Sequence, residues 1–372
     1  MEKKIISAAI DRVVDRLLHL GGADYDADKT ASRDVTKTGV IARDFGIEEW
    51  DWPQGVGIYG LLQLQKQSEN PHQYDAFLQN WFEHNVAIGL PSKNINTTAP
   101  MLTLVEFCRR MDDPQFEALC VERAEWLMKE LPKTKDGGFQ HVTSAIGDRN
   151  GITLNAGELW LDTLFMAGLF LARMGVKYSR KDWVEEAERQ FLVHIKYLYE
   201  KKDGLFYHGW SFLRNDNFGG IYWCRGNSWF TYAAMAVLEI LGDAADGGVK
   251  QYITDTFVYQ AEALHRLQGE DGLWHTVLTD PESYGEVSGS AAIAAGLLKG
   301  IKLGILGEDF RACAEKAIAA ICANVAEDGT VLNVSAGTGM GMDAEHYKNI
   351  IRAPMAYGQS LTLLALIEAL QL

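Results

Sequence analysis

Apolar segments rich in small residues recur along the chain of 372 residues. Their apolar residues occupy nearly every side of a helix with 3.6 residues per turn, which is typical of helices that are buried all round. Successive segments start about 47 to 68 residues apart, a spacing found in repeat architectures. These six predicted inner helices begin near Trp52, Ala99, Leu159, Asn227, Ser288 and Ala353.

A second set of segments lies between the first, and its pattern is amphipathic. Apolar residues stand at i, i+3 and i+4, and charged residues occupy the opposite side, which predicts helices with one face on a core. The predicted outer helices are Ile5–Leu20, His72–Ala87, Pro114–Lys129, Lys181–Tyr199, Val249–Gln268 and Glu308–Ala326.

The strict alternation of outer and inner segments predicts an all-α fold, an (α/α)6 barrel of six helical hairpins. We expect one catalytic domain over residues 1–372. The alternative is an open helical solenoid. Closure is favoured because six pairs is the common closed number and neither terminal pair has the polar outer face of a capping repeat.

The connections before the predicted inner helices are rich in Gly, Asp, Asn and Trp, and several are long. Long loops in a compact domain usually carry function. Because the inner helices should start at one end of the barrel, these loops would form a single cleft. Two further segments, DGGFQHV and KDGLFYHGW, are predicted to be short strands or turns.

Composition narrows the class of protein. Apolar residues make up 47% and charged residues 23%, and no apolar run is long enough to span a membrane. Lys3 and Lys4 precede apolar residues as in a signal peptide, but Asp11 and Arg12 interrupt that stretch, so a cytoplasmic location is expected. The formal net charge of −15 argues against a nucleic-acid partner.

The five cysteines form no CxxC pair and are widely scattered, which argues against a disulfide framework or a structural zinc site. The sequence also lacks HxH and HExxH motifs, so no metal and no other cofactor is expected. It lacks GxSxG, which argues against a serine nucleophile.

Six tryptophans lie in or beside the segments that would form the cleft. Each one alone is explained by core packing, but six together suggest stacking on the apolar faces of sugar rings. They are Trp50, Trp52, Trp160, Trp210, Trp223 and Trp229.

Asp162 lies within an otherwise apolar predicted inner helix. A buried carboxyl with a raised pKa could donate a proton near neutral pH, and Glu158, one helical turn earlier, could raise that pKa by like-charge repulsion. The alternative is a helix-start aspartate that is satisfied by a backbone amide.

Other polar residues of the same loops are candidates for ligand contact. Arg225 could bind a carboxylate with two hydrogen bonds, or it could form a structural salt bridge. His208, between aromatic residues, is placed to contact a ligand. Asn94, Asn96 and Glu286 each fit a cap or turn, and Ser288 is the preferred N-cap of the fifth inner helix.

Several motifs together resemble the unsaturated rhamnogalacturonyl hydrolases of glycoside hydrolase family 105. The resemblance spans roughly residues 44–365, and LWLDTLFM followed by RGNSW is its most specific pair. The other motifs are DWPQGVGIYGL, YHGW and EVSGSA. This family has an (α/α)6 barrel.

The resemblance implies hydration of the C4=C5 vinyl ether in a terminal unsaturated uronate, rather than attack at the anomeric carbon. Asp162 would protonate C4 and help water add at C5, and the hemiketal would open to release the next sugar, often rhamnose. Implied substrate contacts are Trp52, Asn96, His141, His208, Trp223, Arg225 and Trp229. Val142 stands where some relatives have a basic residue, so the aglycone and the role of the loop from His141 to Asp162 stay open, as does any help from Asn96 or Glu286.

Three other functions remain as alternatives. An unsaturated glucuronyl hydrolase acting on glycosaminoglycan fragments would share the chemistry. A sugar epimerase would need paired histidines, and the nine histidines show no such pairing in the sequence. A non-catalytic glycan-binding barrel would make Asp162 a packing residue. The predicted partner is an unsaturated uronyl oligosaccharide.

Overall fold

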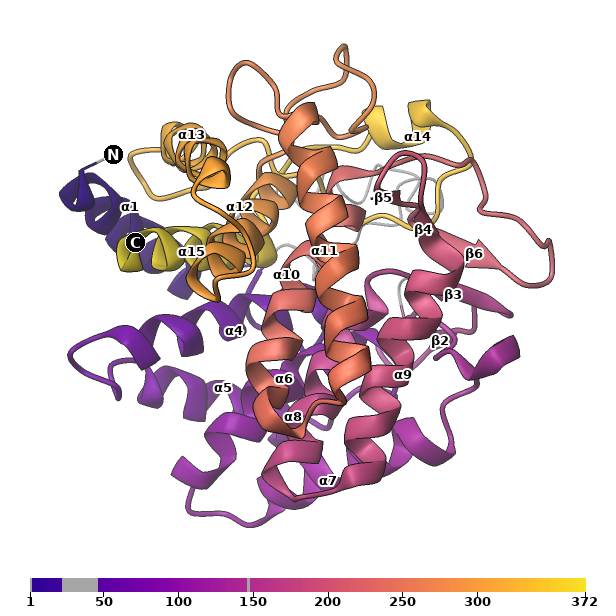
Figure 1. Cartoon of the computed structure of the whole chain (residues 1–372). Helices are drawn as coiled ribbons and strands as arrows, with labels where there is room; N and C mark the ends of the chain where they lie inside the picture. The colour runs from indigo at the N-terminus through magenta and orange to yellow at the C-terminus, as the bar shows by residue number, and fades with distance from the viewer. Residues whose placement is uncertain (1, 22–45, 146–147) are drawn as a thin grey trace.

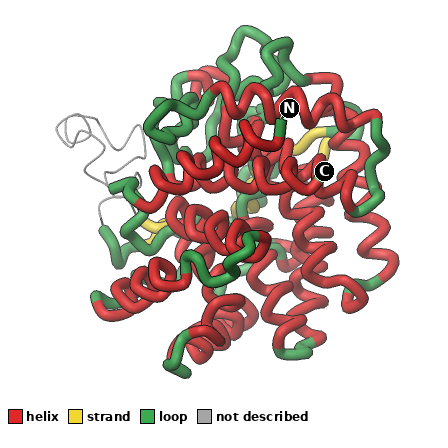
Figure 2. Tube along the Cα trace, turned by 90° about the vertical axis from the view of Figure 1, so that its left-hand side faces the viewer, coloured by secondary structure: helices red, strands yellow, loops and turns green. Residues whose placement is uncertain are grey.

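The computed structural model describes residues 2–21, 46–145 and 148–372. Nearly all of this chain is helix or loop, and strand is confined to short stretches (Figure 2). Six outer helices match the predicted amphipathic segments to within a few residues at each end. They are α1 (Lys3–Leu18), α5 (Asp75–Ala87), α7 (Gln115–Lys129), α9 (Lys181–Leu198), α11 (Gly247–Leu267) and α13 (Asp309–Ala323).

The inner helices alternate with the outer ones, as predicted. They are α4 (Trp52–Gln67), α6 (Ala99–Phe107), α8 (Leu169–Lys177), α10 (Cys224–Leu241), α12 (Val287–Lys302) and α15 (Ala356–Gln371). A short helix that the sequence pattern did not predict, α14 (Ala344–Lys348), precedes α15.

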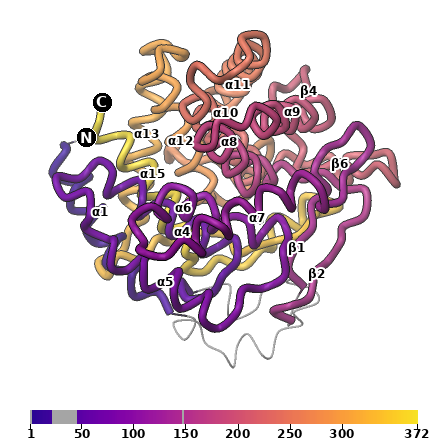
Figure 3. The backbone as a smooth tube through the Cα atoms, turned by 90° about the horizontal axis from the view of Figure 1, so that it is seen from below, coloured from indigo at the N-terminus to yellow at the C-terminus, as the bar shows by residue number. Residues whose placement is uncertain are grey.

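The inner helices form a closed ring. Contacts run from α4 through α6, α8, α10 and α12 to α15, and α15 returns to contact α4. The outer helix α1 packs on α15, so the two ends of the chain lie side by side (Figures 1 and 3). The predicted (α/α)6 barrel is therefore confirmed, and the open solenoid is excluded.

Small residues permit the close contacts within this ring. A Cβ on Gly296 of α12 would lie 2.5 Å from the backbone oxygen of Thr231 in α10. A Cβ on Gly55 of α4 would lie 2.5 Å from the backbone nitrogen of Pro100 in α6. Because real Cβ atoms do not approach so closely, these helix pairs require glycine, which explains the small-residue composition of the inner segments.

The strands are short and lie in the loops at one end of the ring. They are β1 (Thr143–Ser144), β2 (Ile152–Thr153), β3 (Glu158–Trp160), β4 (Tyr199–Glu200), β5 (Leu205–Phe206) and β6 (Gly209–Ser211). Antiparallel pairing joins β1 to β2, β3 to β6 and β4 to β5. KDGLFYHGW therefore forms short strands as predicted, and DGGFQHV begins in the 3-10 turn Lys135–Gly137.

Among the helices that the structure describes, none combines the length and the apolar character needed to cross a bilayer. The single catalytic domain over residues 1–372 stays a prediction. Asp44 and Phe45, at the start of the first predicted cleft loop, lie outside the described residues.

Candidate active site

A two-stranded ribbon brings Asp162 and His208 together. Strand β3 pairs with β6 so that Trp160 lies opposite Gly209. The ribbon is extended by a hydrogen bond from the amide of Leu161 to the carbonyl of His208, 3.0 Å long. Residues 46 positions apart in the sequence therefore become neighbours through backbone pairing, before any side chain is considered.

Asp162 lies just before the third inner helix rather than inside it, which corrects the sequence prediction. It occupies the turn between β3 and a π-helical stretch, Leu164–Gly168, that leads into α8. Its carbonyl accepts the amides of Phe165 and Met166 at 3.1 and 3.0 Å. The sequence pattern did not reveal where the helix starts, because strand β3 is itself partly buried and its apolar residues run on into those of the helix. Single-turn π stretches often accompany functional sites.

The carboxylate of Asp162 faces the imidazole of His208. His208 Nε2 lies 3.3 Å from Asp162 Oδ2, and the two side chains are only 2% and 16% exposed. The pair lacks the alignment of a hydrogen bond, and among the described residues neither atom has another hydrogen-bond partner. The two groups are thus in close contact, and both atoms keep a free direction for a ligand.

The pKa of Asp162 is lowered, not raised as the sequence suggested. Burial, the largest single influence, raises this pKa, but the charge and contact of His208, followed by the charge of His141, outweigh burial. Glu158 does not act on it: its carboxylate accepts the indole N–H of Trp160 at 2.8 Å. In the ligand-free protein Asp162 is therefore an ionised carboxylate beside an imidazole.

Tyr347 of α14 holds the other side of the His208 ring. Its hydroxyl lies 2.9 Å from His208 Nδ1, and its oxygen accepts the amide of Gly341 at 3.1 Å. Because Gly341 supplies the donor to that oxygen, the Tyr347 hydroxyl proton is free to be donated to Nδ1. A neutral His208 then carries its ring proton on Nε2, toward Asp162. The sequence analysis missed Tyr347, which lies 139 residues from His208.

His141 completes one wall beside Asp162. Its ring stacks on Trp160 with centroids 4.3 Å apart, and its Nδ1 lies 2.8 Å from the hydroxyl of Thr163. Burial lowers the pKa of His141 to about 3, although the charge of Asp162 acts to raise it. His141 is therefore neutral over the physiological range and offers hydrogen bonds rather than charge.

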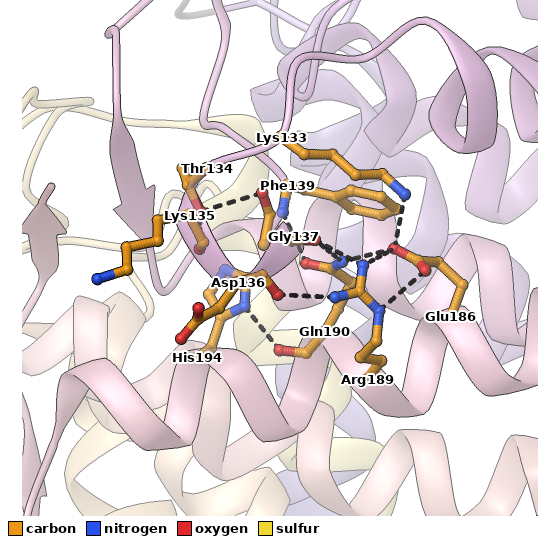
Figure 4. A network of polar contacts seen from close by, with 11 residues as sticks. Lys133, Thr134, Lys135, Asp136, Gly137, Phe139, Glu186, Arg189, Gln190 and His194 are labelled. Carbon is orange, nitrogen blue, oxygen red and sulfur yellow. Dashed lines mark hydrogen bonds and ion pairs between the residues drawn. The ribbon is translucent and has the colours of Figure 1, made fainter.

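A polar network on α9 fixes the segment that leads to His141 (Figure 4). Arg189 donates to the carbonyls of Asp136 and Gly137 at 2.8 and 2.7 Å. Gln190 accepts the amide of Phe139 at 2.7 Å, and its own carbonyl lies 2.7 Å from Nδ1 of His194. This network ties the 3-10 turn to an outer helix, so His141 is held by rigid structure on both sides.

His194 is a third buried histidine near this site, and the sequence analysis missed it. It comes from the outer helix α9, is 0% exposed, and feels the charge of Asp162. Burial lowers the pKa of His194 to about 4. The sequence showed no paired histidines, yet the fold places His208 in contact with Asp162 and brings His141 and His194 within the reach of its charge.

The tryptophans form walls and floor rather than an exposed rim. Trp223 lies against the His208 ring with centroids 4.4 Å apart, and Trp229, fully buried, packs on Phe165 at 5.1 Å. Trp52 stacks on Tyr357 with centroids 4.5 Å apart and remains half-buried. Four of the six candidates are buried, and they are Trp50, Trp160, Trp223 and Trp229.

Trp50 and Trp210 differ from the residues at the site. The indole N–H of Trp50 donates to the carbonyl of Thr97 at 2.9 Å, and its ring stacks on Trp81 at 5.2 Å, so its role is core packing. Trp210 is half-buried and packs on Tyr197 at 5.9 Å. The sequence could not separate these two from the tryptophans around Asp162.

Several buried polar atoms without a partner lie at this site. Among the described residues, six such atoms belong to residues that the sequence selected: Asp162 Oδ2, His208 Nε2, Trp210 Nε1, Trp223 Nε1, Arg225 Nε and Trp229 Nε1. A buried polar atom without a partner costs free energy, so native structures keep few of them without a functional reason. The two that face each other, Asp162 Oδ2 and His208 Nε2, mark the place where a polar ligand would bind.

Arg225 is fully buried and already bound by the protein. Nη1 donates to the carbonyl of Ser335 at 2.7 Å, and Nη2 donates to the carbonyl of Ala336 at 2.8 Å. The guanidinium also lies 3.7 Å from Glu286 and over the ring of Trp223. These contacts match the structural alternative of the sequence analysis, because Nε is the one guanidinium nitrogen without a hydrogen-bond partner in the described chain.

Glu286, and not Ser288, is the N-cap of α12, which corrects a sequence prediction. Its carboxylate accepts the amides of Ser288 and Gly289 at 3.3 and 2.6 Å. It also accepts the amide of Ser335 at 2.9 Å. Glu286 and Arg225 thus fasten the segment after Ser335, whose Gly337 lies against Trp52.

Asn94 and Asn96 have different roles. Asn94 is buried, and its side chain accepts the amide of Thr97 at 2.9 Å, so it is a turn residue. Asn96 begins the 3-10 turn Asn96–Thr98, is half-buried, and makes no side-chain hydrogen bond within the described chain. Of the two, Asn96 is the one with capacity left for a ligand.

No three histidine, cysteine or acidic side chains of the described residues are arranged to hold a metal ion. The site as described is an enclosure of aromatic rings around a carboxylate and buried imidazoles.

The sequence as a whole has known relatives. A family model described as Glycosyl Hydrolase Family 88 matches residues 28–372. The chain belongs to this family. It is 35% identical over 346 residues to the unsaturated rhamnogalacturonyl hydrolase YesR of Bacillus subtilis strain 168, covering 89% of this chain and 93% of that one.

Solved structures agree with the family assignment. A Salmonella enterica serovar Paratyphi A protein, described as a possible member of the GH105 family, is 34% identical with a TM-score of 0.90. That alignment covers 100% of this chain and 95% of the other. The unsaturated glucuronyl hydrolase of Bacillus sp. GL1 shares the fold at 20% identity and a TM-score of 0.65, covering 87% of each chain. As a family 88 member, the chain is a glycoside hydrolase, and the resemblance to unsaturated rhamnogalacturonyl hydrolases is confirmed.

Proposed function

We propose that this family 88 enzyme removes the terminal 4,5-unsaturated uronic acid from pectin-derived rhamnogalacturonan oligosaccharides. The observation that carries the proposal is the buried Asp162–His208 pair, whose facing atoms lie 3.3 Å apart inside an aromatic enclosure. The similarity to YesR over nearly the whole chain supports the choice of substrate.

In the proposed reaction Asp162 donates a proton to C4 of the C4=C5 vinyl ether. Positive charge then develops at C5 and on the ring oxygen, and the carboxylate left on Asp162 stabilises it. Water adds at C5 and returns its proton to Asp162. The resulting hemiketal opens to a C5 ketone, and the hemiacetal at C1 collapses to release the next sugar. One water is consumed for each bond cleaved.

The charge of the bound substrate resolves the conflict between a lowered pKa and the role of an acid. Asp162 takes up its proton from water when the substrate enters. A bound uronate places a second negative charge near Asp162, and like charge raises the pKa of a carboxyl. Substrate binding therefore creates the protonated acid that the free enzyme lacks.

The remaining residues of the enclosure would bind the sugar. Trp52, Trp223 and Trp229 would contact the ring through their indole faces and N–H groups. His141, held neutral, and Asn96 would donate hydrogen bonds to hydroxyls or to the uronate. Arg225 would contribute mainly by holding Trp223 and the segment after Ser335, and its Nε, which has no partner within the described chain, could donate to the sugar.

The test is a spectrophotometric assay on a panel of unsaturated disaccharides, following the loss of the double-bond absorbance. The panel needs an uronyl-rhamnose disaccharide from lyase-digested pectin and a sulfated and an unsulfated glycosaminoglycan disaccharide. Fastest turnover, as kcat/KM, is expected on the uronyl-rhamnose substrate. Absence of turnover on every member of the panel would reject the proposed chemistry, and binding without turnover would favour a non-catalytic barrel.

An unsaturated glucuronyl hydrolase is the second candidate. It stays a candidate because the unsaturated glucuronyl hydrolase of Bacillus sp. GL1 has the same fold. A higher kcat/KM on a glycosaminoglycan disaccharide than on the uronyl-rhamnose disaccharide would select it. The cytoplasmic location stays a prediction from the sequence.

A further inference from the structure

A cavity that the glycosidase site does not use lies between the outer helices α5 and α7 and the inner helix α6. Its volume is about 640 Å³, within the usual range for small-molecule sites. Val86 of α5, Met101 of α6 and Leu119 of α7 supply apolar walls, and Arg123 of α7 supplies a cation. None of the residues that line the cavity belongs to the candidate active site.

Arg123 holds the turn before α6 with one nitrogen of its guanidinium. Nη1 donates to Oγ1 of Thr97 and to Oγ1 of Thr98, each at 3.0 Å, and to the carbonyl of Asn94 at 3.5 Å. Nε and Nη2 have no hydrogen-bond partner in the described chain, and neither atom is sealed from solvent. The edge formed by Nε and Nη2 is thus the part of the guanidinium that can meet a ligand.

Arg123 also lacks a carboxylate partner. Arg123 and Arg225 are the two buried arginines of the described chain, 4% and 0% exposed. The guanidinium of Arg225 lies 3.7 Å from Glu286, whereas Arg123 forms no ion pair within the described residues. The charge of Glu122 reaches Arg123, but the Glu122 carboxylate is paired with Lys93. Because buried charges are normally paired, Arg123 is a cation with room for an anion.

Arg123 stays charged in these surroundings. Burial lowers its pKa to about 10, and the charge of Glu122 acts in the opposite direction. At neutral pH the guanidinium is therefore a cation that is largely removed from water. Such a cation attracts an anion more strongly than an exposed arginine does, because the protein screens the attraction less than water.

We propose that this cavity binds a small monocarboxylate with an apolar body. The N–H bonds of Nε and Nη2 lie parallel along one edge of the guanidinium, which matches the two oxygens of a carboxylate. The apolar body packs against Met101 and Leu119. A single negative charge is preferred, because Glu122 lines the same cavity and repels a second one.

The first experiment titrates the full-length protein with phenylacetate, followed by ligand-observed NMR. Phenylacetate carries one carboxylate on an apolar ring, and phenylacetamide is the matched neutral control. The amide should bind at least about 10-fold more weakly, because it loses the charge-assisted hydrogen bonds to the guanidinium. Equal affinities, or no binding of phenylacetate, would overturn the proposal. Tighter binding of inorganic phosphate than of phenylacetate would contradict a site for an apolar monocarboxylate.

Leu119→Trp tests whether the probe occupies this cavity. The larger side chain fills the space and leaves the bonds from Arg123 to Thr97 and Thr98 in place. Phenylacetate binding should be lost, and hydrolysis of an unsaturated disaccharide should be retained. Leu303→Trp, at an exposed position outside the cavity, is the control and should bind phenylacetate as the wild type does. Binding that survives in Leu119→Trp would place the probe elsewhere and reject the cavity as its site.

Arg123→Lys tests the fork of the guanidinium. Lysine keeps the charge but loses the two parallel N–H bonds, so phenylacetate should bind about 10-fold more weakly or worse. Circular dichroism controls for folding, because Arg123 also holds the turn at Thr97. An unchanged affinity in a folded variant would remove Arg123 from the site. If the variant does not fold, Leu119→Trp and the comparison of acid with amide still decide the proposal.

Discussion

Nε2 of His208 lies 3.3 Å from Oδ2 of Asp162, and the contact is made by residues at the ends of two paired strands. The pairing fixes the backbone on both sides, so the distance does not depend on flexible loops. A carboxylate placed in this way is held beside the imidazole and remains open to a substrate.

Asp162→Asn should keep the fold and ligand binding and lose nearly all turnover. Asparagine has the shape of aspartate but cannot donate the proton, and a general acid–base group typically contributes about 10²–10⁴-fold. The measurements are kcat on an uronyl-rhamnose disaccharide and circular dichroism as the control for folding. A variant that retains more than roughly a tenth of the wild-type kcat would show that Asp162 is not the acid.

Tyr347→Phe should lower kcat by about 2- to 10-fold with little change in KM, because one neutral hydrogen bond to His208 is lost. The pH profile of kcat should shift as well, since the ring proton is no longer held on Nε2. Tyr197→Phe is the matched control, because that hydroxyl contacts Asp136 at the surface. Equal kinetics and equal pH profiles for both variants would remove Tyr347 from the site.

The free energy of unfolding should fall as the pH drops from 7 to 5. Burial lowers the folded-state pKa of His141 to about 3 and of His194 to about 4, so the unfolded chain binds more protons below its own histidine pKa. Stability due to these groups is fully present above the unfolded pKa of about 6.5 and is lost progressively below it.

Each of the two histidines should account for about 2 kcal/mol of the loss between pH 7 and pH 5. His194→Gln should therefore reduce the loss by about 2 kcal/mol in denaturant titrations at the two pH values. His19→Gln, which changes an exposed histidine, is the control and should leave the loss unchanged. An identical pH dependence in the wild type and His194→Gln would contradict the neutral buried state of His194.

Arg225→Met should destabilise the protein by about 3–5 kcal/mol, because it leaves the buried carboxylate of Glu286 without its cation. The double variant Arg225→Met with Glu286→Gln should recover part of that loss in the free energy of unfolding. In kinetics, Arg225→Lys should lose the same factor on a uronate substrate and on its methyl ester. A loss confined to the free acid would instead assign Arg225 to the substrate carboxylate.

The alternating pattern was sufficient to predict the barrel, because burial on all sides and burial on one side leave different periodicities. The stretch from Trp229 to Leu241 is apolar on nearly every side of a helix, which predicts an inner helix. The start of the third inner helix was predicted too early, because the apolar residues of the partly buried strand β3 are continuous with those of the helix. Asp162 was therefore assigned to a helix that begins only after it.

The site was predictable where motifs are local and unpredictable where it depends on long-range contacts. Asp162, His208 and Trp223 follow from short motifs. The lowered pKa of Asp162 depends on His208, and His208 in turn depends on Tyr347, from an unpredicted helix. The sequence left Arg225 between a ligand contact and a structural salt bridge, because its partners, Ser335 and Ala336, lie 110 and 111 residues away.

The most direct test of the account follows two signals in one reaction with an uronyl-rhamnose disaccharide: the double-bond absorbance and the appearance of free rhamnose. Hydration at C4=C5 predicts that the absorbance falls at least as early as rhamnose appears, and that Asp162→Asn abolishes both signals together. Rhamnose that appears ahead of the loss of absorbance would mean attack at the anomeric carbon and would contradict the proposed mechanism.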